Sequence, residues 1–303
     1  MSELVPLFFN NLFPILLAAA IGFALAKWLN INPRPLSQII FYVFSPVLVF
    51  NLITNSQLSN QDILRTVTFA ILLITTVGVL TWLLGRVLKF ERKTLAAVLI
   101  TTMFMNAGNY GLPLTNFAFG ETALAFASVF FVINAVATNT VGIVIASSGS
   151  MSVWNAIKGL VKFPAIYALA LGIIFLQLKW QLPYGLDRTV TLLSNAAIPC
   201  MLLLLGMQLV NIRLNGHALP LIVSSSMRLL IAPALAYGFT LIFGMTGPSF
   251  QAVVLEAAMP AAVMSTILAT EFDAEPTFVT TAVLITTLLS PFTLTPLLAF
   301  LGA

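Results

Sequence analysis

Charged residues are scarce in this chain of 303 residues, of which only 7% are Asp, Glu, Lys or Arg. A soluble domain carries about 25% charged residues, and these keep its surface hydrated. Here 60% of the residues are hydrophobic and the mean hydropathy is +1.05, so polar side chains cannot cover a soluble core. The composition therefore excludes a soluble enzyme, a nucleic-acid-binding protein and a disordered protein.

Cysteine and histidine are almost absent. The single cysteine, Cys200, excludes an internal disulfide and a cysteine-rich metal site. The single histidine, His217, excludes the multi-histidine arrangements that hold zinc or haem. The sequence also has no glycine-rich nucleotide-binding loop and no catalytic triad, so we expect no cofactor. We interpret Cys200 as an apolar filler and His217 as a hydrated residue beside a loop.

Long apolar stretches dominate the chain instead. A transmembrane helix needs about 20 mostly apolar residues. Ten windows of this kind lie near residues 7–26, 36–54, 63–85, 94–118, 122–146, 155–177, 188–209, 218–243, 249–270 and 276–301. They are too long for barrel strands and lack strict alternation, and the loops between them are too short for a folded domain. The sequence predicts an all-α membrane protein with ten transmembrane helices, the first of which is retained and not cleaved as a signal peptide.

Loop charges predict the orientation of these helices. Lysine and arginine accumulate in short cytoplasmic loops. The loops after the odd-numbered spans carry nine of these residues and the opposite side carries three. We therefore expect the odd-numbered loops to be cytoplasmic and both chain ends to lie outside. The loop after the ninth span conflicts with this count, because it holds Glu271, Asp273 and Glu275 and no basic residue.

Prolines recur at similar places in the two halves of the chain. Pro46 and Pro199 stand inside the second and seventh spans, and Pro113 and Pro260 inside the fourth and ninth, each pair about 150 residues apart. Residues 1–150 and 151–303 are thus predicted to be two repeats of five spans each. Because five is odd, the second repeat enters the bilayer upside down. Inverted repeats are typical of secondary transporters, whose substrate sites lie at the midplane.

The fourth span contains residues that interrupt helices. The run from Asn106 to Pro113 holds two asparagines, two glycines and a proline; a proline costs about 3 kcal/mol inside a helix and a glycine about 1. The ninth span has the small residues of Ala257-Ala-Met-Pro260, which let backbones approach closely. Proline favours the first position of a helix, so we expect half-helices that begin at Pro113 and Pro260.

Because the repeats are inverted, the N-termini of both half-helices should face the midplane. Helix N-termini attract anions, so two of them make an anion site without a buried lysine. For single prolines such as Pro46, Pro199 and Pro233, a simple packing kink stays the alternative. The residues predicted to contact the anion are Asn106, Gly108, Asn109, Gly111, Pro113, Met259 and Pro260.

Three segments of the chain resemble the auxin efflux carrier family: Asn106–Thr115, Met227–Pro233 and Gln251–Ala262. That family includes plant PIN auxin exporters and bacterial permeases assigned to malate, malonate and similar acids. The resemblance extends over all ten spans. It implies two inverted five-helix repeats of the PIN/NhaA/ASBT-like type, with a scaffold domain and a transport domain. Broken helices 4 and 9 would cross in the transport domain, and the transport cycle would be elevator-like.

The resemblance also implies roles for individual residues. Asn106 matches the asparagine that contacts the substrate carboxylate in plant members, and Pro113 and Pro260 match the crossover prolines. Asn134 stands where plant members have glutamine in the fifth span, and Asn51 stands where they have histidine in the second. These two asparagines join the predicted substrate-binding set.

The chain departs from the plant members in two places. Their long cytoplasmic loop is reduced here to Ser147–Ser152, and Phe163-Pro164-Ala165 replaces their Asn-Pro-Asn. We therefore do not expect the pocket to copy the auxin pocket.

Two charged residues, Arg228 and Glu256, lie inside the predicted eighth and ninth spans. Charges within a membrane are costly and are usually paired or functional. One hypothesis is an ion pair between Arg228 and Glu256, and the other is a role in a proton or substrate step. Glu256 stands four residues before Pro260 and thus on the same helix face. Plant members have glutamine at this position, so the family does not require this carboxyl for transport.

Together these features predict a secondary transporter that moves a small organic anion across the cytoplasmic membrane. The anion would be a mono- or dicarboxylate, with an auxin-like acid as one option. The expected partners are this anion and the lipid bilayer; the family is compatible with a homodimer, and no nucleic acid is expected. An alternative from another class is a non-transporting membrane sensor or lipid-binding protein on the same scaffold. An intramembrane enzyme is not favoured, because the spans contain no nucleophile–base pair and no paired acids.

Overall fold

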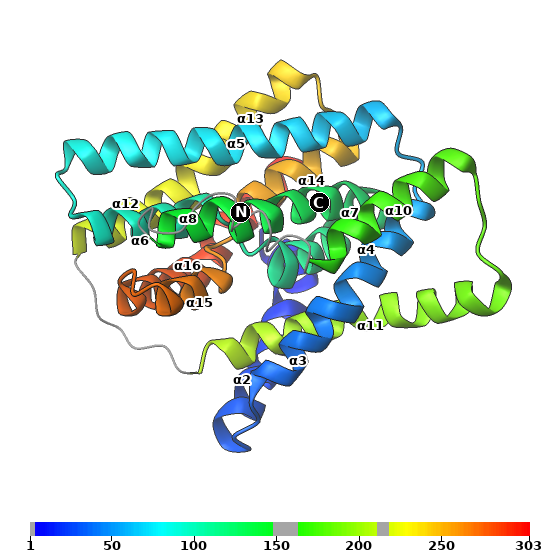
Figure 1. Cartoon of the computed structure of the whole chain (residues 1–303), viewed down its shortest axis with the longest axis horizontal. Coiled ribbons are helices and arrows are strands. Elements are labelled where there is room, and N and C mark those ends of the chain that lie inside the picture. The colour runs from blue at the N-terminus through cyan, green and yellow to red at the C-terminus, as the bar shows by residue number, and fades with distance from the viewer. Residues whose placement is uncertain (1–3, 148–162, 211–217) are drawn as a thin grey trace.

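Every regular element is helical in the computed structural model, which describes residues 4–147, 163–210 and 218–303 (Figure 1). The all-α prediction is confirmed for these ranges. Several features of the sequence analysis lie outside the described residues. They are residues 148–152 of the loop Ser147–Ser152, the start of the predicted sixth span, the boundary between residues 150 and 151, and Arg213 and His217.

The helices before residue 148 form several continuous runs, in which η denotes a short π-helical segment with wider turns. They are α1 (Leu4–Leu7), η1 (Phe8–Leu12) and α2 (Phe13–Trp28); α3 (Pro33–Ile39), η2 (Ile40–Phe44) and α4 (Ser45–Thr54); α5 (Asn60–Val87); α6 (Arg92–Met103); and η3 (Ala107–Gly111), α7 (Leu112–Ala137), η4 (Thr138–Gly142) and α8 (Ile143–Ala146).

The described helices after residue 162 follow in chain order. They are α10 (Pro164–Leu178); α11 (Tyr184–Gln208); α12 (Ala218–Ser226), η6 (Met227–Ile231) and α13 (Ala232–Phe243); α14 (Gly247–Ala257); α15 (Met264–Glu271); and α16 (Pro276–Leu301).

Seven of the described helical runs are long and apolar enough to cross a membrane, and a shorter apolar helix covers Pro164–Leu178. The seven are Leu4–Trp28, Pro33–Thr54, Asn60–Val87, Ala107–Ala146, Tyr184–Gln208, Ala218–Phe243 and Pro276–Leu301. Their outward faces carry large apolar side chains such as Leu64, Ile242 and Phe292, which suits contact with lipid.

Two predicted spans are interrupted and one long run is bent. The span at 94–118 stops at Met103 and resumes at Ala107, and the span at 249–270 stops at Ala257 and resumes at Met264. The run Ala107–Ala146 turns at Gly120, where φ is 72° and ψ is −168°. Only glycine adopts this backbone region readily, and the bend falls between the predicted fourth and fifth spans.

Four mid-span prolines follow a π-helical segment. In each case the proline is the second residue of the next α-helix, and the residue before it donates its N–H five residues back instead of four. A proline ring clashes with the carbonyl four residues back, and the wider turn relieves that clash. The helices can therefore continue through these prolines, which are Pro14, Pro46, Pro113 and Pro233.

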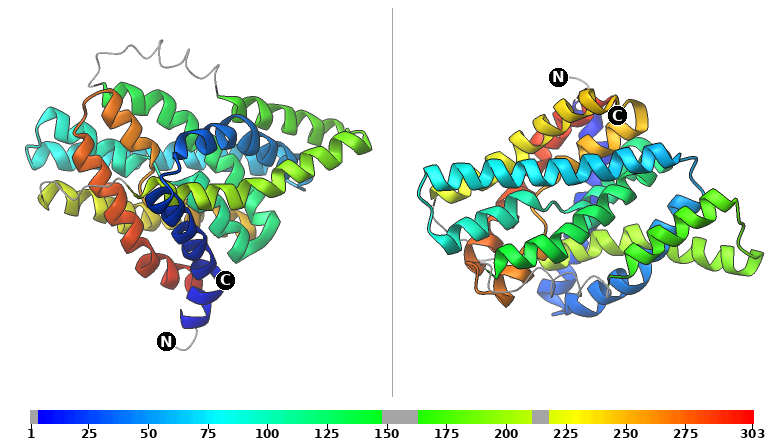
Figure 2. Two further views of the ribbon diagram at one scale, coloured as in Figure 1. Left: turned by 90° about the horizontal axis from the view of Figure 1, so that it is seen from below. Right: turned by 45° about the horizontal axis from the view of Figure 1, so that its top comes forward.

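Glycines bring α2 and α11 into direct backbone contact. A Cβ on Gly206 would lie 1.6 Å from the carbonyl oxygen of Ala19, and a Cβ on Gly22 would lie 2.0 Å from that of Leu203. Small residues permit this close approach in membrane helices. Helix α10 also packs along α4, and α14 along α7 (Figure 2).

Polar contacts show which loops lie at the same end of the bundle. Lys93 lies just before the interrupted span at 94–118, and Asp273 lies just after the one at 249–270. The two side chains form a salt bridge, with 2.5 Å between Nζ and Oδ2. This bond raises the pKa of Lys93 above its usual value. Gln177 donates to Asn60 over 2.9 Å, which joins the loops after α4 and α10. The acidic loop after α15 therefore sits beside the basic loop after α5, as the predicted orientation requires. The first and last helices, α1 and α16, also contact each other.

Candidate functional site

The interruptions of the two broken spans lie against each other. The N–H of Asn106 donates to the carbonyl of Pro260 over 2.8 Å, and the N–H of Ala262 donates to that of Phe104 over 3.0 Å. Met105 and Ala261 thereby form a single antiparallel bridge. This pairing satisfies backbone groups that the broken helices leave free, which the interior of a membrane protein requires.

Arg228 joins the ends of both helices that stop at this crossing. Its guanidinium, fully buried, donates to the carbonyl of Thr102 in the last turn of α6 over 2.6 Å and to that of Ala257 at the end of α14. Helix C-termini carry partial negative charge and free carbonyls, so one cation compensates two helix ends. The hypothesis of an ion pair between Arg228 and Glu256 is therefore wrong, because the guanidinium binds backbone carbonyls and the carboxyl oxygens of Glu256 have no partner.

Asn134 holds the interrupted backbone from α7. Its Nδ2 donates to the carbonyl of Met105 over 2.9 Å, and its Oδ1 accepts the N–H of the same residue over 3.4 Å. Both polar atoms of this side chain are thus used to fix the crossing. Asn134 positions the site, in addition to lining it.

A small cavity of about 150 Å³, here named the crossover pocket, opens beside the paired segments. Four of the residues that the sequence singled out, Asn106, Gly108, Asn109 and Asn134, line it. The Nδ2 of Asn106 is buried and has no hydrogen-bond partner, in a residue that is 5% exposed. No charged side chain lines this pocket in the part of the chain that the structure describes. An unpaired amide donor is therefore its most polar unsatisfied group.

The half-helices begin at other residues than the prolines. After the break, helical structure resumes at Ala107, six residues before Pro113, and Pro260 lies in the paired extended segment ahead of α15. The unwound segment is Phe104–Asn106, which ends where the predicted helix-interrupting run from Asn106 to Pro113 begins. The π-helical turn of η3 explains the difference, because it lets Pro113 sit inside a continuing helix.

Residues on the facing helices complete the crossover pocket. Besides Val263 and Met264 at the start of α15, the lining includes Ser45 and Gln208. Met259 and Pro260 do not line it, although both are buried at the crossing. The sequence does not single out Ser45 and Gln208, for which the only signal is a polar side chain inside an apolar span.

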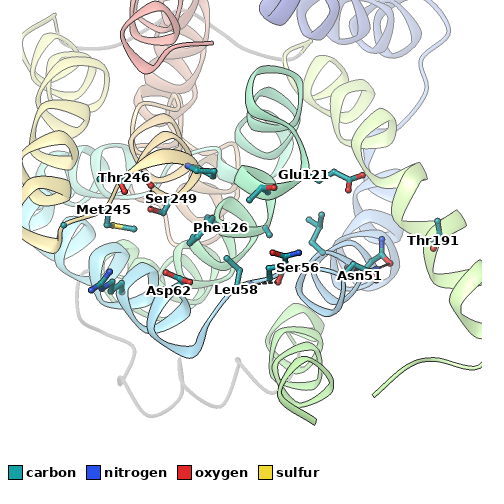
Figure 3. A pocket seen from close by; sticks show the side chains of 18 of the residues that line it. Asn51, Ser56, Leu58, Asp62, Glu121, Phe126, Thr191, Met245, Thr246 and Ser249 are labelled. Carbon is teal, nitrogen blue, oxygen red and sulfur yellow. Dashed lines mark hydrogen bonds between the residues drawn. The ribbon is translucent and has the colours of Figure 1, made fainter. Parts of the chain in front are cut away.

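Asn51 lies in a different place from Asn106. It lines a cavity of about 820 Å³, here named the Asn51 cavity, together with Glu121 and Thr191 (Figure 3). Its Nδ2 donates to Ser194 over 3.2 Å, and its Oδ1 accepts from Asn55 over 3.0 Å. The structure thus does not bring Asn51 together with the crossover residues.

The two cavities lie along the same three helices, α4, α7 and α11. Ser45, Phe131 and Gln208 face the crossover pocket, whereas Asn51, Phe126 and Asn195 face the Asn51 cavity. The buried apolar residues between them along these helices include Leu48, Val49, Val129, Ala197 and Met201. Buried apolar residues therefore lie between the two cavities along these helices.

Sequence comparisons identify the relatives of this architecture. The family described as "Membrane transport protein" matches residues 7–155 and 150–298. The chain belongs to this family. It is 28% identical over 258 residues to an "Uncharacterized transporter" of Methanothermobacter thermautotrophicus, covering 84% of each chain. The "Uncharacterized transporter MJ1031" of Methanocaldococcus jannaschii is 26% identical over 266 residues, which cover 86% of each chain.

A plant protein extends this comparison to the predicted family. "Auxin efflux carrier component 8" of Arabidopsis thaliana is 27% identical over 146 residues, which cover 46% of this chain and 40% of the plant one. The resemblance to the auxin efflux carrier family is thereby confirmed. Together with its apolar helices, this membership makes the chain a multi-pass membrane protein of a transport family.

Proposed function

We propose that this membrane transport protein is a secondary transporter of a small organic anion, a mono- or dicarboxylate, in the cytoplasmic membrane. The proposed topology has ten crossings in two inverted repeats of five. The first interrupted span runs from the start of α6 to the bend at Gly120 and counts as one crossing. The second runs from the start of α14 to the end of α15 and also counts as one crossing. The contact between Lys93 and Asp273 supports this count, because it requires α6 to begin on the side where α15 ends.

The observation that carries the proposal is the unpaired amide nitrogen of Asn106 in the crossover pocket. A buried donor without an acceptor costs about 1–3 kcal/mol, and a carboxylate oxygen of a substrate would satisfy it. The helical run from Ala107 and helix α15 both start at this pocket, where Gly108 and Met264 are lining residues. Helix N-termini add partial positive charge for an anion.

The size and charge of the pocket favour a small substrate. Its volume of about 150 Å³ is below the roughly 300–1,000 Å³ of pockets for drug-sized ligands. Because neutral donors and helix ends replace a lysine, the empty pocket avoids the cost of a buried charge. Release of the anion should then be easy, as transport requires. Movement of the crossing helices against α2, α4, α10 and α11 would be of the elevator type.

Substitution of Asn106 tests this proposal. Asn106→Ala removes one donor to a buried anion, so affinity for the best-binding acid should fall about ten- to a hundredfold. Asn106→Asp should be worse, because it places like charge beside the carboxylate. The matched control is Asn55→Asp, which makes the same change at an exposed residue of the Asn51 cavity.

The measurement is thermal stabilisation of the purified protein by acetate, malonate, malate and indole-3-acetate, because a ligand stabilises the state that it binds. Flux of the best acid into proteoliposomes follows. Normal binding and flux by folded Asn106→Asp protein would contradict the site. Binding without flux in the unsubstituted protein would instead identify a sensor.

A further inference from the structure

Glu256 is the one fully buried acidic side chain among the described residues. It lies in the last turn of α14, and neither of its carboxyl oxygens has a hydrogen-bond partner. The hydroxyl of Thr115, on α7, is its polar neighbour and is also unpartnered. An ionised carboxylate in this setting would lose its hydration, and the Thr115 hydroxyl is its one neighbouring donor among the described residues.

The other charged and ionisable groups around α14 do not compensate this carboxyl. Arg228 is bound to the carbonyls of Thr102 and Ala257. Tyr110 of η3 is bonded to Ser290. The remaining ionisable groups on the described elements packed against α14 are Tyr237 of α13, Glu121 of α7, and Asp62, Arg65 and Arg86 of α5. None of these forms a hydrogen bond or an ion pair with Glu256.

The space around the carboxyl suits a proton better than a metal ion. A Cβ on Gly111 would lie 2.1 Å from Oε2 and 2.6 Å from Oε1 of Glu256, so the carboxyl covers this glycine directly. Glu256 lines neither the crossover pocket nor the Asn51 cavity. Hard cations need about six oxygen ligands, and no cluster of three His, Cys, Asp or Glu exists among the described residues.

A short chain of contacts connects Glu256 with Asn106. The carboxyl rests on Gly111, whose N–H donates to the carbonyl of Asn106 over 3.0 Å. The N–H of Asn106 in turn donates to Pro260, four residues after Glu256. The backbone of Asn106 is therefore hydrogen-bonded on one side to Gly111, on which the carboxyl of Glu256 rests, and on the other side to Pro260, which follows Glu256 in the chain.

We propose that Glu256 is a proton-binding site whose occupancy controls the affinity of the crossover pocket for its anion. The inference rests on the proposed anion site for its functional consequence. Only the turn from Asn106 to Gly111 separates the carboxyl from the pocket, and two negative charges across it would repel each other in a medium of low dielectric, whereas a protonated carboxyl does not repel an anion. Above the pH at which the empty site loses its proton, the anion therefore binds together with one proton, which is taken from bulk water and returned to it on release. By linkage, each ligand raises the affinity for the other.

This linkage has a measurable size. If one proton is bound with each anion, affinity should fall about tenfold per pH unit above the range in which the free site loses its proton. Glu256→Gln keeps the shape of the neutral acid, so it should hold high affinity at every pH. The matched control is Glu121→Gln, which changes an exposed carboxyl of the Asn51 cavity and should keep the pH dependence.

Two measurements test the proposal on the full chain. Infrared spectra at neutral pH should show the carbonyl stretch of a protonated carboxylic acid, which disappears in Glu256→Gln and stays in Glu121→Gln. Calorimetry with malonate, or with the acid that stabilises the protein most, is done above the pH at which this band fades from the free protein. In buffers of different ionisation enthalpy it should then show proton uptake on binding in the unsubstituted protein. Glu256→Gln should show none.

The outcomes separate this inference from the proposed function. A missing protonated-acid band in the unsubstituted protein would overturn the proton site, as would equal proton uptake in both proteins. If the band belongs to Glu256 but no carboxylate binds, the proton site stands and the anion function is contradicted. Should Glu256→Gln fail to fold, the band and the proton uptake of the unsubstituted protein still decide.

Discussion

Arg228 shows how a single residue can solve a structural problem that lies between two helices. Each interrupted span leaves carbonyls without partners at the end of its first half, and one guanidinium reaches one carbonyl from each. The planar fork of arginine allows this double contact. The residue therefore stabilises the crossing that presents Asn106, without lining the crossover pocket itself.

Removing the guanidinium group of Arg228 should destabilise the protein strongly. Arg228→Met leaves two buried carbonyls unsatisfied at about 1–3 kcal/mol each, and Arg228→Lys should lose less, since an ammonium can still reach one of them. Thermal unfolding in detergent measures both. Arg34→Met, at an exposed position, should change stability by no more than about 0.5 kcal/mol. Equal melting temperatures for the Arg228 and Arg34 variants would show that the bridge does not stabilise the fold.

The helices are the scale at which the sequence was most informative. Runs of apolar residues predicted nearly every helix, because length and hydrophobicity decide what can cross a membrane. The cluster from Asn106 to Pro113 correctly marked an interrupted span. The exact break could not be predicted, since η3 accommodates Pro113 through a wide turn that composition does not reveal. The partners of Arg228 were also beyond the sequence, because backbone carbonyls leave no signal in it.

The contact between α2 and α11 yields a prediction at the scale of elements. Gly206→Ala would place its Cβ 1.6 Å from a backbone oxygen of α2, so the two helices must separate, at about 1–3 kcal/mol or more. The matched control is Gly238→Ala in α13, where a Cβ meets nothing within 4 Å. The control should be neutral or slightly stabilising. Thermal unfolding measures the stability of both variants. Equal stabilities would contradict the close packing of α2 and α11.

For the whole molecule, the arrangement of loops follows from contacts between distant segments. The acidic loop after α15 has no basic residue and so does not add to the orientation predicted from lysine and arginine. Its contact with Lys93 places it at the same end of the bundle as the basic loop after α5. The contact of Gln177 with Asn60 joins two loops that the same orientation places on the opposite side.

Labelling from one side of the membrane tests the ten-crossing topology. Single cysteines replace Lys93, Asp273, Asn60 or Gln177 in a Cys200→Ser background. An impermeant thiol reagent added to intact cells should label positions 60 and 177 and reach positions 93 and 273 only after permeabilisation. Cys200→Ser protein without a new cysteine is the control. Labelling of 93 and 273 from opposite sides would mean that the spans have been counted wrongly.

The bridge made by Arg228 also has a consequence for biogenesis. The ribosome makes α6 long before it makes Arg228 and residues 260–262, which supply the guanidinium and the paired backbone segment. The break at residues 104–106 therefore stays without these partners until the later helices have been synthesised. Completion of the crossing is thus a late step in the biogenesis of the protein.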